Sequence, residues 1–232
     1  LHELLIMRPA INIQDLSFHY EDAHPILKLD AFEVKMQEKV FIYGPSGCGK
    51  STLLGLIAGV FLPQNGTLEV LGLDFCSTSR SKRDEIRGKE IGYIFQTFNL
   101  IPYLSCLENI LLPCIITRQR KTKITGSLEQ EAALLAEHLN LTGVLHKKAR
   151  QLSVGQQQRV AAARALIGNP QLVIADEPTS SLDGKNTNEF LQLLLREWEE
   201  KKFTLMFVSH DERLADEFNR SVSLPELNQV RE

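Results

Sequence analysis

The sequence predicts an α/β fold whose core is a parallel sheet. Three short apolar runs carry this prediction: "KVFIYG", "LVIADE" and "TLMFVSH" each have the length and continuous hydrophobicity of a strand buried on both faces. One helical pattern follows the first run, and another, "NTNEFLQLLLREWEEK", separates the second run from the third. Buried strands that alternate with helices are typical of parallel α/β cores.

The first part of the chain, to about Thr67, is predicted to be rich in strands. "AINIQDLSFHY" and "AFEVKM" alternate apolar and polar residues, which favours strands buried on one face only. We expect one domain over residues 8–224. The preceding "LHELLIM" lacks a basic leader, so residues 1–7 are interpreted as a possible N-terminal extension, with Met7 as a candidate start.

The middle of the chain predicts a mostly helical insertion over about residues 98–152. "CLENILLPCII" and "LEQEAALLAEHLNL" have helical periodicity. The basic run "RQRKTK" between them is predicted to be an exposed, solvated loop.

Composition narrows the class of protein. The chain has 232 residues, 43% of them hydrophobic and 24% charged, as in ordinary soluble globular proteins. Its net charge of −3 gives no nucleic-acid footprint, and its apolar runs are too short to span a membrane. Cys48, Cys76, Cys106 and Cys114 form no C-x-x-C pair, so we expect free thiols in a reducing compartment such as the cytosol.

The stretch "GPSGCGKS" matches the phosphate-binding pattern G-x-x-x-x-G-K-[ST] between a predicted strand and a predicted helix. Its glycines let backbone N–H groups surround phosphates at a helix N-terminus. Lys50 is expected to reach the β- and γ-phosphates and Ser51 to bind Mg²⁺, with Thr52 as a further contact. The predicted phosphate-binding residues are Gly44, Pro45, Ser46, Gly47, Cys48, Gly49, Lys50, Ser51 and Thr52. A chance glycine turn is the alternative interpretation.

Two carboxylates end the strand "LVIADE". In nucleotide hydrolases the first such carboxylate, here Asp176, assists Mg²⁺. Glu177 is then placed to polarise an attacking water. Two surface acids at a strand end are the alternative interpretation.

Three other polar or aromatic residues end predicted strands. His210 and Gln96 follow apolar strands, where parallel sheets present functional side chains. Tyr20 ends the first alternating strand and could stack on a base. For each residue an ordinary structural role remains open: a partly buried histidine, a turn glutamine and an aromatic strand end.

The turn "LSVGQ" contains a glycine that a helix start does not need. Ser153 and Gln156 have capping-box spacing, which explains the helix start. Gly155 would instead permit close approach of the backbone to an anion.

Taken in order along about residues 11–224, these segments resemble the ATP-binding-cassette (ABC) ATPases. "GPSGCGKST" resembles the Walker A motif, "FQTFNL" the Q-loop, "LSVGQ" the signature, "LVIADEP" Walker B, "SSLD" the D-loop and "SHD" the H-loop. The segment "FNLIPYLSCLENILLP" is most similar to the lipoprotein-release, macrolide-export and cell-division group. The resemblance implies a P-loop NTPase fold with a RecA-like core, an N-terminal antiparallel β subdomain and a helical subdomain.

The resemblance also implies a mechanism with ATP and Mg²⁺ as cofactors. Two copies would sandwich two ATP molecules head to tail and drive a separate membrane permease docked near residues 96–113, at the cytoplasmic face of the membrane. Carried over by motif, Tyr20 stacks on adenine and Glu177 is the catalytic base. The Mg²⁺ ion is held by Ser51, Gln96 and Asp176. Gln96 senses closure, His210 contacts the γ-phosphate, Ser153, Gly155 and Gln156 contact it from the second copy, and Asp183 communicates across the dimer.

The sequence departs from the family pattern at two places. Val154 stands where the signature commonly has a glycine, and "SVSLPELNQVRE" replaces the usual Asp-Gly turn, which leaves the last strands open. Other classes compete with a transporter: a cell-division type of mechanical ATPase, a soluble ABC protein of DNA repair or translation, and a simple P-loop kinase or GTPase. No nucleic-acid partner is expected, and the cargo cannot be predicted from motifs that contact only ATP.

Overall fold

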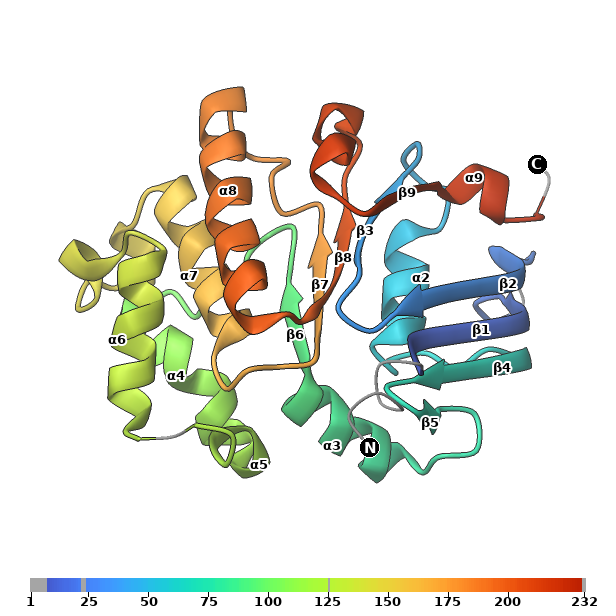
Figure 1. The fold of residues 1–232 in the computed structure, drawn as a ribbon, viewed down its shortest axis with the longest axis horizontal. Helices are drawn as coiled ribbons and strands as arrows, with labels where there is room; N and C mark the ends of the chain where they lie inside the picture. Colours follow the sequence, from blue (N-terminus) through green and yellow to red (C-terminus); the bar gives the residue numbers. More distant parts are fainter. Residues whose placement is uncertain (1–7, 22–23, 125, 231–232) are drawn as a thin grey trace. The chain divides into compact units, whose positions relative to one another are not determined.

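The computed structural model describes residues 8–21, 24–124 and 126–230 (Figure 1). The N-terminal extension predicted for residues 1–7 lies outside the described residues. The chain divides into two compact units: unit 1 comprises Leu1–Arg87 and Thr204–Glu232, and unit 2 comprises Gly88–Phe203. The single domain over 8–224 and the insertion over 98–152 stay predictions.

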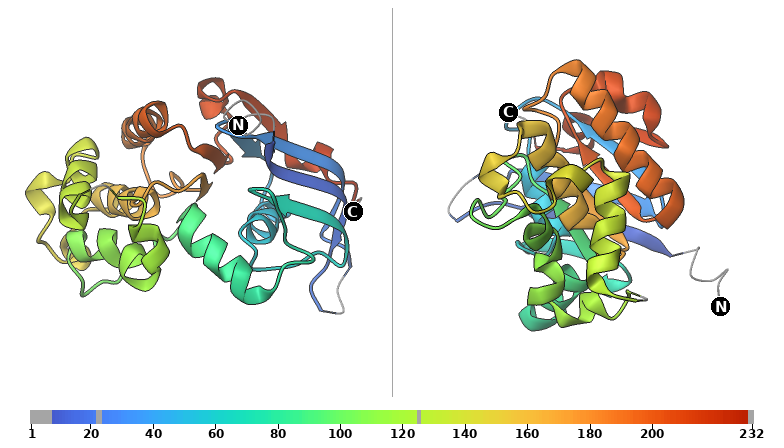
Figure 2. Two further views of the ribbon diagram at one scale, coloured as in Figure 1. Left: turned by 60° about the horizontal axis from the view of Figure 1, so that its bottom comes forward. Right: turned by 90° about the vertical axis from the view of Figure 1, so that its left-hand side faces the viewer.

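Unit 1 contains the antiparallel sheet predicted near the N-terminus. Its strands run in the order β2-β1-β4-β5. Their bounds are β1 Pro9–Phe18, β2 Leu27–Lys35, β4 Asn65–Val70 and β5 Leu73–Asp74. The alternating pattern works as expected, because Ile13 is fully buried and pairs with Phe32 on one side and Leu68 on the other. Helix α2 (Lys50–Ile57) lies along one face of this sheet (Figures 1 and 2).

Unit 1 also contains three parallel strands in the order β8-β3-β9. They are β3 (Lys39–Tyr43), β8 (Thr204–Val208) and β9 (Arg220–Ser223), with the 3₁₀ helix η3 (Glu212–Glu217) before β9. Every residue of β8 is buried, as its continuous apolar sequence predicts.

The sequence did not predict the last strands of the chain. In the structure this C-terminal segment packs within unit 1. Strand β9 pairs with β3, and Pro225 lies at the start of α9 (Leu224–Leu227), where its fixed φ suits a helix start. The Asn228 side chain then accepts from the Lys28 N–H and donates to the Ile26 carbonyl, and so covers the free edge of β2.

Unit 2 contains two parallel strands, β6 (Ile91–Ile94) and β7 (Leu172–Asp176), with helices around them. The helices are the end of α3 (Arg80–Glu90), α4 (Cys106–Ile116), α5 (Arg118–Lys121), α6 (Leu128–His138), α7 (Val154–Leu166) and α8 (Gly184–Lys201), with the 3₁₀ turns η1 (Thr142–Val144) and η2 (Ala149–Gln151). Helices α4, α6 and α7 each begin with a serine capping box. Helices α4 and α6 confirm the helical periodicity predicted for "CLENILLPCII" and "LEQEAALLAEHLNL".

The prediction that "RQRKTK" is a solvated loop is wrong. Its first four residues form α5, and Arg120 is only 3% exposed. The Arg120 guanidinium donates to the carbonyls of Ile91, Ala165 and Ile167, so it ties α5 to β6 and to the end of α7. Burial lowers its pKa to about 10, and the side chain therefore remains charged at neutral pH. A fork of five donors can satisfy buried carbonyls in this way without a carboxylate partner.

The four cysteines are free thiols, with Cys106 and Cys114 buried. No helix among residues 8–21, 24–124 and 126–230 is long and apolar enough to cross a membrane.

Candidate functional site

In unit 1 the predicted phosphate loop joins β3 to α2, as the motif requires. Pro45, Ser46 and Gly47 are exposed, while Gly47 and Gly49 have φ values of 86° and 100° that a side chain would strain. Gly49 is the N-cap of α2, and no side chain caps this helix. The N-terminus of a helix carries a partial positive charge and directs backbone N–H groups outward, so an end without a side-chain cap suits a bound anion.

Lys50 is held inside the phosphate loop. Its ammonium donates to the carbonyls of Gly44 at 2.8 Å and Pro45 at 2.9 Å, and the residue is 8% exposed. Phosphate oxygens are stronger acceptors than neutral carbonyls. The Lys50 ammonium is therefore placed where it could transfer from these carbonyls to a phosphate at the N-terminus of α2.

Tyr20 lies two residues beyond β1 and beside the phosphate-loop helix. Its hydroxyl shares a hydrogen bond of 3.2 Å with the Thr52 hydroxyl. The ring packs edge-on against Phe18 and Phe61, with one side of the residue open, since Tyr20 is 41% exposed. An aromatic ring held in this way offers a stacking surface next to the phosphate loop.

His210 comes from the same edge of the parallel strands as the phosphate loop. Ile42 of β3 is in register with Val208 of β8, and the Ser209 N–H donates to the Ile42 carbonyl at 3.1 Å. His210 is exposed just beyond that contact. Parallel strands deliver their following residues to one edge, so unit 1 brings His210 and the phosphate loop to the same side.

In unit 2 the ends of β6 and β7 bring together Gln96 and the two carboxylates. Ile94 is in register with Ala175, so Gln96, which follows β6, and Asp176, the last residue of β7, lie at the same edge of the two strands. The Tyr93 hydroxyl donates to Asp176 Oδ2 at 3.4 Å. Burial and the Asp176 charge raise the pKa of the Tyr93 hydroxyl, which therefore stays a donor to the carboxylate.

Glu177 adopts a left-handed conformation with φ of 44°, which is uncommon for a residue other than glycine. The next residue, Pro178, accepts a hydrogen bond of 2.6 Å from the Gln158 side chain on α7. Strained backbone held by its surroundings is typical of functional sites. The conformation turns the chain sharply at the residue predicted to be the catalytic base.

The signature turn starts α7, as the capping pattern predicts. The Ser153 hydroxyl accepts from the Gln156 N–H at 3.3 Å, and Gln156 Oε1 accepts from the Ser153 N–H at 3.0 Å. Ser153 and Val154 are exposed.

Gly155 is not required by the fold of this chain. Its φ is not in the left-handed region, and a Cβ placed on it meets no atom within 4 Å. An alanine would fit the helix equally well within the chain. The glycine therefore leaves an open surface beside the exposed Ser153.

Asp183 caps α8. Its Oδ1 accepts from the Asn186 N–H at 2.9 Å, and its Oδ2 accepts from the Asn186 side chain at 3.0 Å. These hydrogen bonds lower the pKa of the Asp183 carboxyl, which is therefore ionised at neutral pH. The D-loop residue thus sets where α8 begins.

Sequence reasoning missed two residues of α7 that hold this side of unit 2. Gln158 is 1% exposed and fixes the turn after Glu177. Arg164, 8% exposed, donates to the carbonyls of Phe98 at 2.5 Å and Asn99 at 2.6 Å, just after Gln96. Their polar character within an otherwise buried helix face was the signal available in the sequence.

The chain is similar to several known proteins. The family model described as "ABC transporter" matches residues 27–180. The chain is 37% identical over 219 residues to the lipoprotein-releasing system ATP-binding protein LolD of Hydrogenovibrio crunogenus, covering 93% of this chain and 94% of that protein. It is 35% identical over 199 residues to the macrolide export ATP-binding/permease protein MacB of Bdellovibrio bacteriovorus, covering 86% of this chain and 30% of that protein.

A solved structure gives the same result for the fold. The dimeric post-hydrolysis state of the ATP-binding cassette MJ0796 bound to ADP and Pi is similar with a TM-score of 0.79 and 35% identity, covering 92% of this chain and 93% of that chain. The predicted ABC ATPase fold and the resemblance to the lipoprotein-release and macrolide-export group are confirmed. The chain belongs to the ABC transporter family, as an ATP-binding subunit with ATPase activity.

Proposed function

We propose that this subunit hydrolyses ATP in a head-to-tail dimer and thereby drives a separate membrane permease. The observation that carries the proposal is the signature turn: an exposed Ser153 beside Gly155, where no neighbouring atom of the chain fills the space. A surface left open in this way suits a γ-phosphate brought by a second copy. The solved cassette MJ0796 is described as dimeric and bound to ADP and Pi, which supports a dimer as the active form.

The residues of unit 1 would bind the nucleotide within one copy. The residues from Gly44 to Thr52 hold the phosphates, with Lys50 as the cation. The open face of Tyr20 stacks on adenine, and His210 contacts the γ-phosphate from the end of β8. Support comes from the uncapped N-terminus of α2 and from the shared strand edge described above.

The proposed metal is Mg²⁺, and the donors fit it. The Ser51 hydroxyl, the Asp176 carboxylate and the Gln96 amide oxygen are all oxygen ligands, which Mg²⁺ prefers. Bound there, Mg²⁺ would neutralise charge on the phosphates. Tyr93 helps by keeping the Asp176 carboxylate oriented through its hydroxyl.

Glu177 is proposed to take a proton from the attacking water as general base. Its left-handed backbone, fixed by the contact from Gln158 to Pro178, sets where its carboxylate stands. The signature residues Ser153, Gly155 and Gln156 would contact the γ-phosphate of the other copy. Asp183 would transmit closure across the dimer, since it defines the start of α8.

The partner is proposed to be an integral membrane permease that holds this subunit at the cytoplasmic face of the membrane. LolD, which this chain matches over nearly its full length, is named as the ATP-binding protein of a lipoprotein-releasing system. MacB, of which this chain spans 30%, is named as an ATP-binding/permease protein. The docking surface would lie near residues 96–113, where Tyr103 is 68% exposed. The proposed cargo is a lipoprotein that the complex releases, or a drug or peptide that it exports.

The Glu177→Gln variant tests this function. It should bind ATP as the unmodified protein does, lose about 100-fold or more in turnover, and accumulate as a dimer in sedimentation with ATP. Glu189→Gln, on exposed α8 surface, is the control and should behave like the unmodified protein. Unchanged hydrolysis in Glu177→Gln would remove Glu177 from its role. Co-purification with ribosomes or DNA in place of a membrane protein would overturn the transporter assignment.

A further inference from the structure

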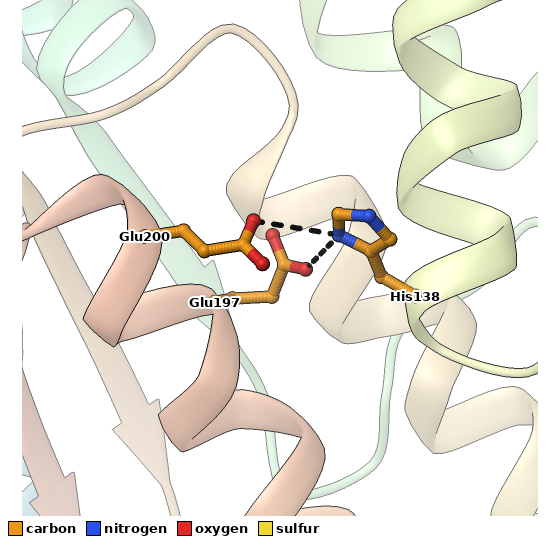
Figure 3. Close-up of side chains that lie close together, drawn as sticks. All are labelled: His138, Glu197 and Glu200. Atoms are coloured by element: carbon orange, nitrogen blue, oxygen red, sulfur yellow. Dashed lines mark hydrogen bonds and ion pairs between the residues drawn. The ribbon is translucent and has the colours of Figure 1, made fainter.

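A cluster of ionisable side chains joins α6 to α8 in unit 2, away from every ATP motif in the sequence. It contains His138 in the last turn of α6 and Glu197 and Glu200 on α8 (Figure 3). One ligand atom from each residue lies within 4.8 Å of the other two. Nothing in the proposed ATPase mechanism uses these three residues.

Both carboxylates point at the same imidazole nitrogen (Figure 3). His138 Nδ1 is 2.6 Å from Glu197 Oε1 and 3.7 Å from Glu200 Oε2. Residues three apart on a helix share a face, which explains how α8 supplies two groups to one point. The Glu197 side chain is 1% exposed, whereas those of His138 and Glu200 are 30% and 58% exposed. The cluster is therefore anchored inside the protein and open to solvent on one side.

The charges around this point do not balance. Lys201 Nζ lies 3.2 Å from Glu197 Oε2 and 3.7 Å from Glu131 Oε1. Three carboxylates against one ammonium leave two negative charges when the imidazole is neutral. A proton on His138 would compensate only one of them. A divalent cation would compensate both.

We propose that His138, Glu197 and Glu200 bind a divalent transition-metal ion, with Zn²⁺ as the ion that fits best. One imidazole and two carboxylates form a ligand set typical of Zn²⁺, while an imidazole is a poor ligand for Mg²⁺ or Ca²⁺. In a tetrahedral Zn²⁺ site, ligand atoms lie about 3.5 Å apart. Binding would widen the contact between His138 and Glu197 slightly, and water from the exposed side would complete the coordination.

The surroundings of the cluster support a metal ion in one further respect. Lys201 Nζ forms an ion pair with Glu197 Oε2, while Glu197 Oε1 faces His138. Partners of this kind orient metal ligands. The ion would link α6 to α8, the helix that Asp183 starts, and so stiffen unit 2 whether or not ATP is bound.

The test uses the full-length protein without an affinity tag, treated with EDTA and free of nucleotide. Titration with Zn²⁺ against a chromophoric chelator should show one bound ion per chain, and Zn²⁺ should raise the thermal unfolding midpoint. The variants His138→Ala and Glu200→Gln should each lose about 10- to 100-fold in Zn²⁺ affinity and most of the thermal shift. Glu199→Gln, one residue away on α8 and 63% exposed, and His146→Ala are matched controls that should keep both.

Any of three other outcomes would overturn the proposal. Equal Zn²⁺ binding by His138→Ala and the unmodified protein would mean that the cluster is only an ion pair. Binding that survives both variants but is lost when Cys48 and Cys76 are blocked would assign the ion to thiols. Equal losses in Glu199→Gln and Glu200→Gln would show a general charge effect on α8.

Discussion

Two helices of this molecule, α2 and α7, begin at glycine-containing motifs that are expected to contact phosphate. Their N-termini differ in structure. Helix α2 in unit 1 begins at Gly49 in a left-handed conformation, with no side-chain cap and with Lys50 buried in the loop. Helix α7 in unit 2 begins at Ser153 with a complete capping box and exposed side chains. The first end has no side-chain cap, while the second is capped by its own serine.

This difference explains why one end would bind nucleotide alone and the other would not. The loop before α2 has a backbone that suits an anion, since Gly47 and Gly49 adopt conformations that other residues avoid. The backbone of α7 is an ordinary helix start, and only the space beside Gly155 is unexplained by the chain itself. We therefore expect substitutions in α2 to affect ATP binding and substitutions in α7 to affect turnover alone.

The largest effect is expected from Lys50→Ala. Loss of a charged hydrogen-bond donor to phosphate costs about 1.5–3 kcal/mol, which corresponds to about 10- to 100-fold weaker ATP binding. Turnover should fall by about 100-fold or more. Equilibrium binding of a fluorescent ATP analogue and a phosphate-release assay measure the two quantities. Normal ATP affinity in this variant would contradict the view that the N-terminus of α2, unlike that of α7, binds the nucleotide within one chain.

Ser153→Ala should separate stability from catalysis. Removing a serine cap costs about 1 kcal/mol of unfolding free energy. Ser105→Ala, which removes the same capping box from α4, is the matched control and should cost a similar amount. Only Ser153→Ala should lower turnover, by about 10-fold or more, with ATP binding to the single chain unchanged. Chemical denaturation and steady-state ATPase assays distinguish the two variants. Equal turnover in both would reduce Ser153 to a helix cap.

The smallest effect is expected from Val154→Gly, which restores the common signature residue. Val154 is 48% exposed, and substitutions at exposed positions usually change free energies by less than about 0.5 kcal/mol. Turnover should therefore change by less than about threefold in the ATPase assay. A larger increase would show that the β-branched side chain limits closure of the dimer.

The sequence predicts the local elements well because their physical causes are local. Continuous apolar runs became the buried strands β3, β7 and β8, and the serine spacing at Ser153 became a capping box. The strand-end residues Gln96 and His210 also lie where parallel strands should deliver them.

What the sequence could not predict depends on distant partners. Arg120 stands in a basic run that is indistinguishable from a solvated loop until the carbonyls of β6 and α7 are in place. His138 and Glu197 are separated by 59 residues, so no spacing pattern connects them. The left-handed conformation of Glu177 arises where β7 ends and the chain is held by Gln158, which composition does not reveal.

The central claim is that the signature turn acts on the nucleotide of a second copy, and Gly155→Asp in a Glu177→Gln background tests it most directly. A carboxylate in the open space beside Gly155 would repel a γ-phosphate approaching there. We predict that nucleotide binding to the monomer stays unchanged while ATP-dependent dimerisation, measured by sedimentation velocity, is lost. The claim would be contradicted if the variant still formed an ATP-dependent dimer. It would also be contradicted if the variant monomer bound ATP more weakly than the parent monomer.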